Sequence, residues 1–269
     1  MRKSRLLIVI SLFLITILLV AAGCSKAAPA PETKPESQPA EKTALERIKE
    51  AGVITVGNSP DYPPFETVDD KGNVVGFDVD LLDAIAAELG VKAELKNMGF
   101  DTIITAVQND QVDIGMSGFS ISDERKEKVD FTVPYWKGGQ VVVIAPDSPI
   151  KTLEDLNGQV VATGMGTTCA EVANEQISGA EIRELDSFNT AFMMLKNGSA
   201  MAVVADLAVA NEYIRKDNFV ALGEPLNFEE NAIVVKKGNP ELVNELSRII
   251  TKLEESGKIT ELAKKWEMQ

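Results

Sequence analysis

The sequence predicts an α/β fold arranged as two lobes. Short β-rich runs alternate with stretches of helical hydrophobic period from residue 53 to the end of the chain, a pattern typical of sheets with mainly parallel strands. The part expected to fold, from about residue 43 to 269, is long for one compact domain and suits two lobes. Polar loops follow several predicted strands, and ligands bind at that edge of such sheets.

The individual elements follow from hydrophobic period and stop signals. Residues 81–89 form an apolar stripe of helical period, and Gly90 ends it. The same reasoning predicts further helices at 44–50, 188–196 and, as a pair, 240–266. The predicted strands, rich in β-branched residues, are 53–56, 112–116, 140–145, 160–162 and 202–204.

The N-terminal residues carry the pattern of a secretory signal. Three basic residues among the first five precede an apolar run over 6–20, and small residues lead into Cys24. The stretch resembles a bacterial lipoprotein signal, which implies a signal peptide of residues 1–23 and a diacylated Cys24. This chain departs from that pattern at Ala21, where Leu is preferred. An uncleaved anchor is the alternative, because the apolar run is at the short end of what spans a bilayer.

Residues 24–42 predict a disordered, Pro-rich tether. Prolines alternate with Ala, Glu, Lys and Ser, and no large apolar residue occurs, so the segment cannot bury enough surface to fold. Two acyl chains on Cys24 hold a protein stably at a membrane where one would not. We therefore expect a lipid-anchored protein on the extracytoplasmic face of the cell membrane.

Charge and composition exclude several functional classes. The net charge is −14, and removing a signal with three basic and no acidic residues takes it to −17. A nucleic-acid partner needs a basic footprint, so we expect none. The chain has no histidine, and Cys169 is the only thiol left after lipidation. We expect a monomer with no metal, cofactor or catalytic residue, and Cys169 as a small packing residue.

The loop at 117–125 is the most informative of the predicted strand ends. A glycine and several serine hydroxyls leave N–H and O–H donors free for a ligand, and Ser122 predicts an N-cap that starts a helix. Arg125, one turn in, can point back over the loop and bind a carboxylate with its planar fork. The local sequence equally allows a surface arginine paired with Glu124 or Asp130.

Two other strand ends offer partners for a small polar molecule. Residues 164–168 present N–H groups and hydroxyls at a helix start, without the lysine or glycine spacing of a phosphate loop. Asp206 directly follows a hydrophobic strand, where a carboxylate can meet an ammonium group, although helix capping is the simpler local role. Tyr62 and Phe100 are candidate aromatic walls, with core packing as the alternative.

The run from Gly76 to Leu89 resembles the signature of bacterial extracellular solute-binding proteins that deliver polar amino acids to ABC importers. Residues 62–65, 117–135 and 166–168 resemble further motifs of that family, and the resemblance covers essentially the whole folded part. It implies a bilobal, periplasmic-binding-protein type II fold. Two crossover strands would join lobe 1, residues 43–134 plus 232–269, to lobe 2, residues 135–231.

The resemblance also implies residue roles. Arg125 would bind the α-carboxylate of a polar L-amino acid, and Asp206 its α-ammonium group, because a buried zwitterion needs a partner for both charges. Tyr62 and Phe100 would flank the side chain. The full set of expected ligand-binding residues is Ser59, Asp61, Tyr62, Phe100, Ser117, Gly118, Ser120, Arg125, Thr167, Thr168 and Asp206.

The expected ligand depends on the loop at 59–65. Basic-amino-acid and glutamine binders of the family often carry Asp where this chain has Ser59. Asp61 lies two residues on, however, and the loop resembles that of arginine receptors. Tyr62 over Phe100 would sandwich a guanidinium group by cation–π contacts. We expect arginine or another basic amino acid, with glutamine next.

Two other functions fit parts of the pattern. Relatives resembling cyclohexadienyl dehydratase are enzymes that use a glutamate as acid in the second-lobe loop. This chain has Cys169 near that place and no histidine, so we expect no enzyme here. A sensory protein that presents ligand to a receptor is the second alternative, and with three residues after Trp266 we expect no output domain. In the transport interpretation the partner is an ABC permease, and the tether keeps the domain near it.

Overall fold

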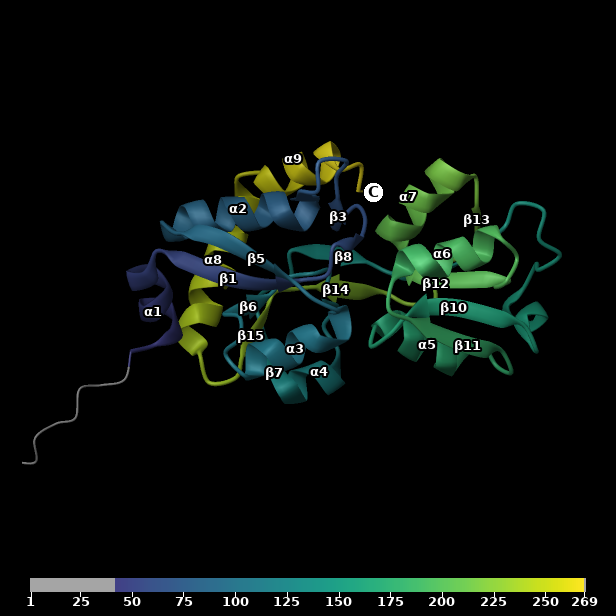
Figure 1. Ribbon diagram of the computed structural model, residues 1–269, viewed down its shortest axis with the longest axis horizontal. Helices are drawn as coiled ribbons and strands as arrows, with labels where there is room; N and C mark the ends of the chain where they lie inside the picture. Colours follow the sequence, from purple (N-terminus) through teal and green to yellow (C-terminus); the bar gives the residue numbers. More distant parts are fainter. Residues whose placement is uncertain (1–41, 269) are drawn as a thin grey trace, which may run out of the picture. The chain divides into compact units, whose positions relative to one another are not determined.

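The computed structural model describes residues 42–268 (Figure 1). The predicted signal, Cys24 and all but the last residue of the predicted tether lie outside them. Within the described range, no helix is long and apolar enough to cross a membrane. Two five-stranded sheets carry the helices, and the predicted α/β, bilobal fold is confirmed.

The first lobe is built on the sheet of order β5-β1-β6-β15-β7. Its strands are β5 (Lys92–Asn97), β1 (Val53–Asn58), β6 (Ile114–Gly115), β15 (Val234–Lys236) and β7 (Val129–Phe131). A small antiparallel sheet precedes α2, with strands β2 (Asp61–Tyr62), β3 (Glu66–Val68) and β4 (Val74–Val75). The helices of this lobe are α1 (Ala44–Ala51), α2 (Phe77–Leu89), α3 (Phe100–Gln108), α4 (Asp123–Lys128), α8 (Pro240–Glu255) and α9 (Lys258–Lys265).

The second lobe is built on the sheet of order β11-β10-β12-β9-β13. Its strands are β11 (Glu181–Leu185), β10 (Val160–Gly164), β12 (Ala202–Asp206), β9 (Gln140–Ile144) and β13 (Val220–Leu222). Its helical elements are α5 (Thr168–Gln176), α6 (Phe188–Lys196), α7 (Leu207–Asp217) and the 3-10 turn η1 (Leu153–Leu156). The strands β8 (Trp136–Gly138) and β14 (Glu229–Asn231) pair antiparallel and connect the lobes (Figure 1).

The expectation of mainly parallel strands is confirmed with one exception in each sheet, because four of the five strands run in the same direction and one is reversed. β1 pairs parallel with β5 and β6, but β15 pairs antiparallel with β6 and β7. In the other sheet β10 pairs parallel with β11 and β12, whereas β9 pairs antiparallel with β12 and β13. The reversed strands are those that the chain enters directly from β8 or β14, so crossing between lobes sets their direction.

The helix α2 shows how the hydrophobic pattern produces the fold. Leu81, Leu82 and Ile85 are buried on one face, and burial of each such side chain stabilises the fold by about 2 kcal/mol. Gly90 ends the helix with φ at 76°, in the left-handed region where glycine is favoured. The predicted stripe and stop are therefore confirmed, although α2 begins earlier, at Phe77.

Candidate ligand-binding site

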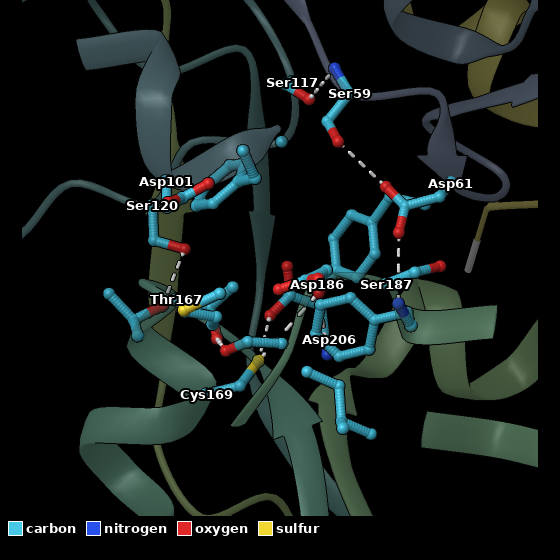
Figure 2. A pocket seen from close by; sticks show the side chains of 18 of the residues that line it. Ser59, Asp61, Asp101, Ser117, Ser120, Thr167, Cys169, Asp186, Ser187 and Asp206 are labelled. Carbon is cyan, nitrogen blue, oxygen red and sulfur yellow. Dashed lines mark hydrogen bonds between the residues drawn. The ribbon is translucent and has the colours of Figure 1, made fainter. Parts of the chain in front are cut away.

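A pocket lies between the lobes, with residues of both in its wall (Figure 2). It contains about 510 Å³ of space not filled by atoms, counting its open mouth. All eleven residues expected to bind ligand line it. The eight other lining residues are Asp101, Gly164, Met165, Cys169, Leu185, Asp186, Ser187 and Phe188.

Arg125 reaches the pocket because Ser122 starts α4 one turn before it. The Ser122 hydroxyl accepts from the backbone N–H of Arg125 at 3.3 Å, which is the predicted N-cap. The buried Arg125 side chain turns back over the loop, and its Nη1 donates to the carbonyl oxygen of Ser120 at 2.8 Å. Its Nη2 donates to the carbonyl oxygen of Gly166, on the other lobe, at 3.1 Å.

The alternative of a surface ion pair for Arg125 is wrong. Glu124 instead bonds Lys128 at 2.6 Å, and Asp130 lies 3.8 Å from Lys237. Burial lowers the pKa of Arg125, but a guanidinium stays charged in proteins. The pocket therefore contains a fixed positive charge.

Asp206 occupies the N-cap position of α7, yet its side chain makes no capping bond. Its Oδ1 instead accepts from Cys169 Sγ and from Gln140 Nε2, each at 3.4 Å. Its backbone N–H donates to the hydroxyl of Tyr62, across the lobes, at 3.2 Å. The carboxylate thus faces the pocket rather than the helix start, which favours the ligand-binding interpretation over capping.

Glu229, in β14, is a second acid at this end of the pocket that the sequence did not reveal. It is 8% exposed, and its Oε2 lies 3.2 Å from the hydroxyl of Thr168. Burial and the neighbouring Asp206 carboxylate raise the pKa of Glu229 to about 9. Glu229 is therefore protonated at neutral pH.

Gln140, the first residue of β9, links these groups. Its Nε2 lies 2.7 Å from the Thr168 hydroxyl and 3.3 Å from Cys169 Sγ. The fully buried amide is a polar residue at the start of an otherwise apolar strand. That contrast is the signal in the sequence that could have identified it.

Cys169 is buried as expected, but it is more than a packing residue. It lines the pocket beside Asp206 and Gln140. Burial raises the pKa of the Cys169 thiol well above its usual value, so the thiol stays protonated and is a poor nucleophile.

Asp61 makes a contact that the sequence did not predict. Its Oδ1 accepts from the Ser59 hydroxyl at 3.0 Å, and its Oδ2 accepts from the backbone N–H of Phe188 at 3.1 Å. Phe188 is the first residue of α6 on the other lobe, where a carboxylate is favoured by the helix dipole. Figure 2 shows both bonds as dashed lines. The Asp61 carboxylate is therefore engaged between the lobes.

The aromatic walls differ from the expected pair. The ring of Tyr62 lies against Phe188, with centroids 4.6 Å apart, and stacks on Phe65 at 5.8 Å. Phe100 stacks instead on Phe119, with centroids 4.5 Å apart. The guanidinium carbon of Arg125 lies within about 5.4 Å of the centres of both these rings. Phe100 thus supports Arg125, and Phe188 is an aromatic wall that sequence reasoning missed.

The remaining expected residues have internal partners. The Thr167 hydroxyl caps α5, accepting from Ala170 N and donating to the carbonyl oxygen of Gly164 at 2.7 Å. The hydroxyls of Thr168 and Ser120 lie 3.1 Å apart, one on each lobe. With the Asp61, Asp206 and Arg125 contacts, these bonds show that the structure is a closed form.

A two-lobed fold closed around a pocket with a guanidinium and several carboxylates is typical of a solute-binding protein. The chain belongs to the bacterial extracellular solute-binding proteins, family 3, whose sequence model matches residues 54–269. The class is one of binding proteins that work with ABC transporters, and not of enzymes.

Three comparisons illustrate the similarity. The L-cystine-binding protein TcyJ of Escherichia coli (strain K12) is 31% identical over 231 residues, covering 84% of this chain and 87% of TcyJ. The P235GK mutant of ArgBP from T. maritima is 40% identical with a TM-score of 0.78, covering 83% of this chain and 98% of that one. The ancestral amino acid-binding protein AncCDT-1, a precursor of cyclohexadienyl dehydratase, is 37% identical with a TM-score of 0.80, covering 83% of this chain and 99% of that one.

Proposed function

We propose that this protein is the substrate-binding lipoprotein of an amino-acid ABC importer, which closes its lobes around a polar L-amino acid and delivers it to the permease. The observation that carries the proposal is the placement of Arg125 and Asp206, from different lobes, in one pocket. A zwitterion held by both favours the closed form, because only that form offers both charges at once.

The α-carboxylate of the ligand would bind Arg125. A guanidinium has five N–H donors, and carbonyl oxygens of Ser120 and Gly166 accept from Nη1 and Nη2. Donors thus remain for a carboxylate, and the stacked rings beneath hold the guanidinium plane in place. The α-ammonium group would bind Asp206, with Glu229 behind it.

The charge of the pocket wall favours a basic side chain. Asp101 and Asp186 line the pocket in addition to Asp206, and Arg125 is the one cation among the described residues that line it. A guanidinium or ammonium side chain would be attracted to such a wall. The distal end of L-cystine, the ligand in the name of TcyJ, carries a carboxylate as well as an ammonium group, so it would gain less from this wall than a basic side chain. Arginine or another basic amino acid is our first choice, and glutamine the second.

The lipid anchor belongs to the same proposal. The signal pattern before Cys24 and the Pro-rich composition of 24–42 support a tethered monomer on the extracytoplasmic face. A tether of that kind would raise the concentration of the loaded domain near a permease in the same membrane. Replacement of Cys24 by Ser should release the protein from the membrane fraction, and a variant that stays bound would exclude lipidation as the anchor.

A thermal-unfolding screen against the twenty amino acids and L-cystine tests the binding function. A ligand that binds only the folded state stabilises it by about 2.7 kcal/mol at a concentration 100 times its Kd. We expect the largest rise in melting temperature with a basic amino acid. If no amino acid raises it, the proposed function is wrong; if only glutamine or cystine does, the ligand choice is wrong and the class stands.

A further inference from the structure

Two carboxyl groups beneath the pocket are not used by the proposed function. They belong to Glu66 in β3 and Asp78 in α2, which are 0% and 1% exposed. Neither lines the pocket. Among residues 42–268, no lysine or arginine forms an ion pair with either carboxyl, so nearby cations do not compensate for their burial.

One oxygen of each carboxyl is bonded to a loop that lines the pocket. Glu66 Oε1 accepts from the Ser117 hydroxyl at 2.7 Å, and Ser117 Oγ in turn accepts from the backbone N–H of Ser59 at 3.1 Å. Asp78 Oδ2 accepts from the backbone N–H of Gly118 at 2.9 Å. The two acids therefore hold neighbouring residues of the same loop.

The hydroxyl of Tyr135 is a further donor to Asp78 Oδ2, at 2.8 Å. Asp78 thus accepts two hydrogen bonds and Glu66 accepts one. A carboxylate with more donors retains its negative charge more readily. If one of the two acids is ionised, the contacts favour Asp78.

The other oxygen of each acid, Glu66 Oε2 and Asp78 Oδ1, is buried and has no hydrogen-bond partner. The backbone brings the two residues together, since Asp78 N donates to the carbonyl oxygen of Phe65 at 2.9 Å. Two ionised carboxylates placed side by side without a cation are strongly unfavourable. A single proton between them gives both orphaned oxygens a partner.

We propose that Glu66 and Asp78 share one proton through Oε2 and Oδ1, and that this acid pair positions the loop at Ser117 and Gly118 that forms one wall of the pocket. Glu66 carries the proton and donates it to the Asp78 carboxylate. The inference rests on contacts in the first lobe and does not depend on which ligand the pocket takes.

The electrostatic surroundings agree with this arrangement. Burial raises the pKa of both acids. The neighbouring Asp78 raises the pKa of Glu66 further, whereas the hydrogen bond with Glu66 lowers the pKa of Asp78. Asp61 is the other acid that raises the pKa of Glu66, and Tyr135 is the titratable donor that faces Asp78. No cation is among the groups that act on the pair in the part of the chain described here.

Amide substitutions test the shared proton without a ligand. In Glu66→Gln the amide N–H replaces the proton and the amide oxygen still accepts from Ser117. In Asp78→Asn the new N–H points to Glu66, and the oxygen still accepts from Gly118. In the double variant two NH₂ groups face each other, and neither can accept.

We expect each single variant to melt within about 4 °C of the wild-type protein, and the double variant to lose at least about 8 °C beyond the sum of the single shifts. Additive shifts would overturn the proposal. Because the measurement contains no amino acid, its failure is distinct from failure of the transport function.

A pH series gives a second, independent measurement if the double variant does not fold. An acid whose pKa is raised by folding is stabilising below its unfolded pKa and loses that contribution as pH rises to the folded pKa. Between pH 6 and 9 the melting temperature should fall more for the parent than for Glu66→Gln, with Glu229→Gln present in both so that this other buried acid does not titrate. Equal slopes would show that the pair does not hold the proton.

Discussion

Arg125 Nη2 donates a 3.1 Å hydrogen bond to the carbonyl oxygen of Gly166, and the two residues belong to different lobes. The side chain expected to bind the ligand thus also contacts the opposite lobe in the closed form. Gly166 has φ at 69°, and an added Cβ there would lie 3.2 Å from the Cβ of Asp101 on the first lobe. Ligand recognition and lobe closure therefore meet at the same place in the fold.

Arg125→Ala should abolish binding of every amino acid that the wild-type protein binds. Loss of one partner of a buried charge pair costs about 3–5 kcal/mol, which is at least a hundredfold in Kd. Arg125→Lys should recover only part of the affinity, because an ammonium lacks the planar fork. Isothermal titration measures both variants.

The matched control for Arg125 is Arg183→Ala, which removes an exposed arginine paired with Glu181 at 2.8 Å. Exposed pairs contribute little, so this variant should bind as the wild-type protein does. If Arg125→Ala still binds amino acids as the wild-type protein does, Arg125 does not bind the ligand carboxylate.

Asp61→Ala should weaken all ligands by a similar factor, about tenfold, because it removes a charge-assisted bond between the lobes at Phe188 N. The loss should appear as faster dissociation, since the bond exists only in the closed form. Stopped-flow release of arginine and of glutamine measures it. If arginine alone were weakened, Asp61 would instead contact the cationic side chain, as the sequence suggested.

Asp186→Asn offers the contrasting case. This acid lines the pocket, and we expect it to act on the ligand side chain through its charge. The variant should weaken basic amino acids and leave glutamine nearly unchanged. Equal weakening of both in titration would contradict a role in side-chain charge selection.

Ligand binding should release protons near pH 8 through Glu229. Its pKa of about 9 in the closed pocket reflects burial and the Asp206 carboxylate, and an ammonium group placed beside both acids lowers it. The binding enthalpy should then depend on the ionisation enthalpy of the buffer. Glu229→Gln should remove that dependence, while Glu230→Gln, which changes the partly exposed neighbour paired with Lys137, should keep it.

The same raised pKa predicts how stability varies with pH in the free protein. Glu229 has a higher pKa folded than unfolded, so its contribution is full below about pH 4 and is lost as pH rises towards 9. The melting temperature of Glu229→Gln should therefore fall less steeply over that range. An identical decline in both proteins would mean that Glu229 is ionised in the fold.

The elements and loops were predictable because their signals are local. The helix over 188–196 begins and ends where its hydrophobic period indicates, and Ser122 caps the helix that carries Arg125. The expected site residues converge because they follow strands of the same sheets. The direction of β9 and β15 was not predictable, since it depends on where the chain crosses between lobes.

The site residues that the sequence did not predict were missed for a different reason. Glu229 lies in a crossover strand, and Phe188 lies in the apolar stripe of α6. The local sequence around each is therefore the same as for a residue with a purely structural role. The contact of Asp61 exists only because the lobes close, and residues 61 and 188 are far apart in the chain. Such roles follow from tertiary arrangement, which one sequence does not contain.

Gly164→Ala should weaken ligand binding by displacing an aromatic wall. Gly164 ends β10, and a Cβ there would lie 2.3 Å from the Phe188 ring, too close for the ring to stay in place. Overpacking of this kind costs about 1–3 kcal/mol, and the ring would move towards the pocket that both residues line. We expect a rise in Kd of about ten- to a hundredfold by isothermal titration.

The rescue of Gly164→Ala separates this cause from a general loss of stability. A second substitution, Phe188→Leu, removes the crowded ring edge and should recover part of the affinity, although Phe188→Leu alone should weaken binding. Two substitutions in contact give such a partial recovery when the second relieves the clash that the first creates. Additive losses in the double variant would show that the ring is not what the methyl group displaces.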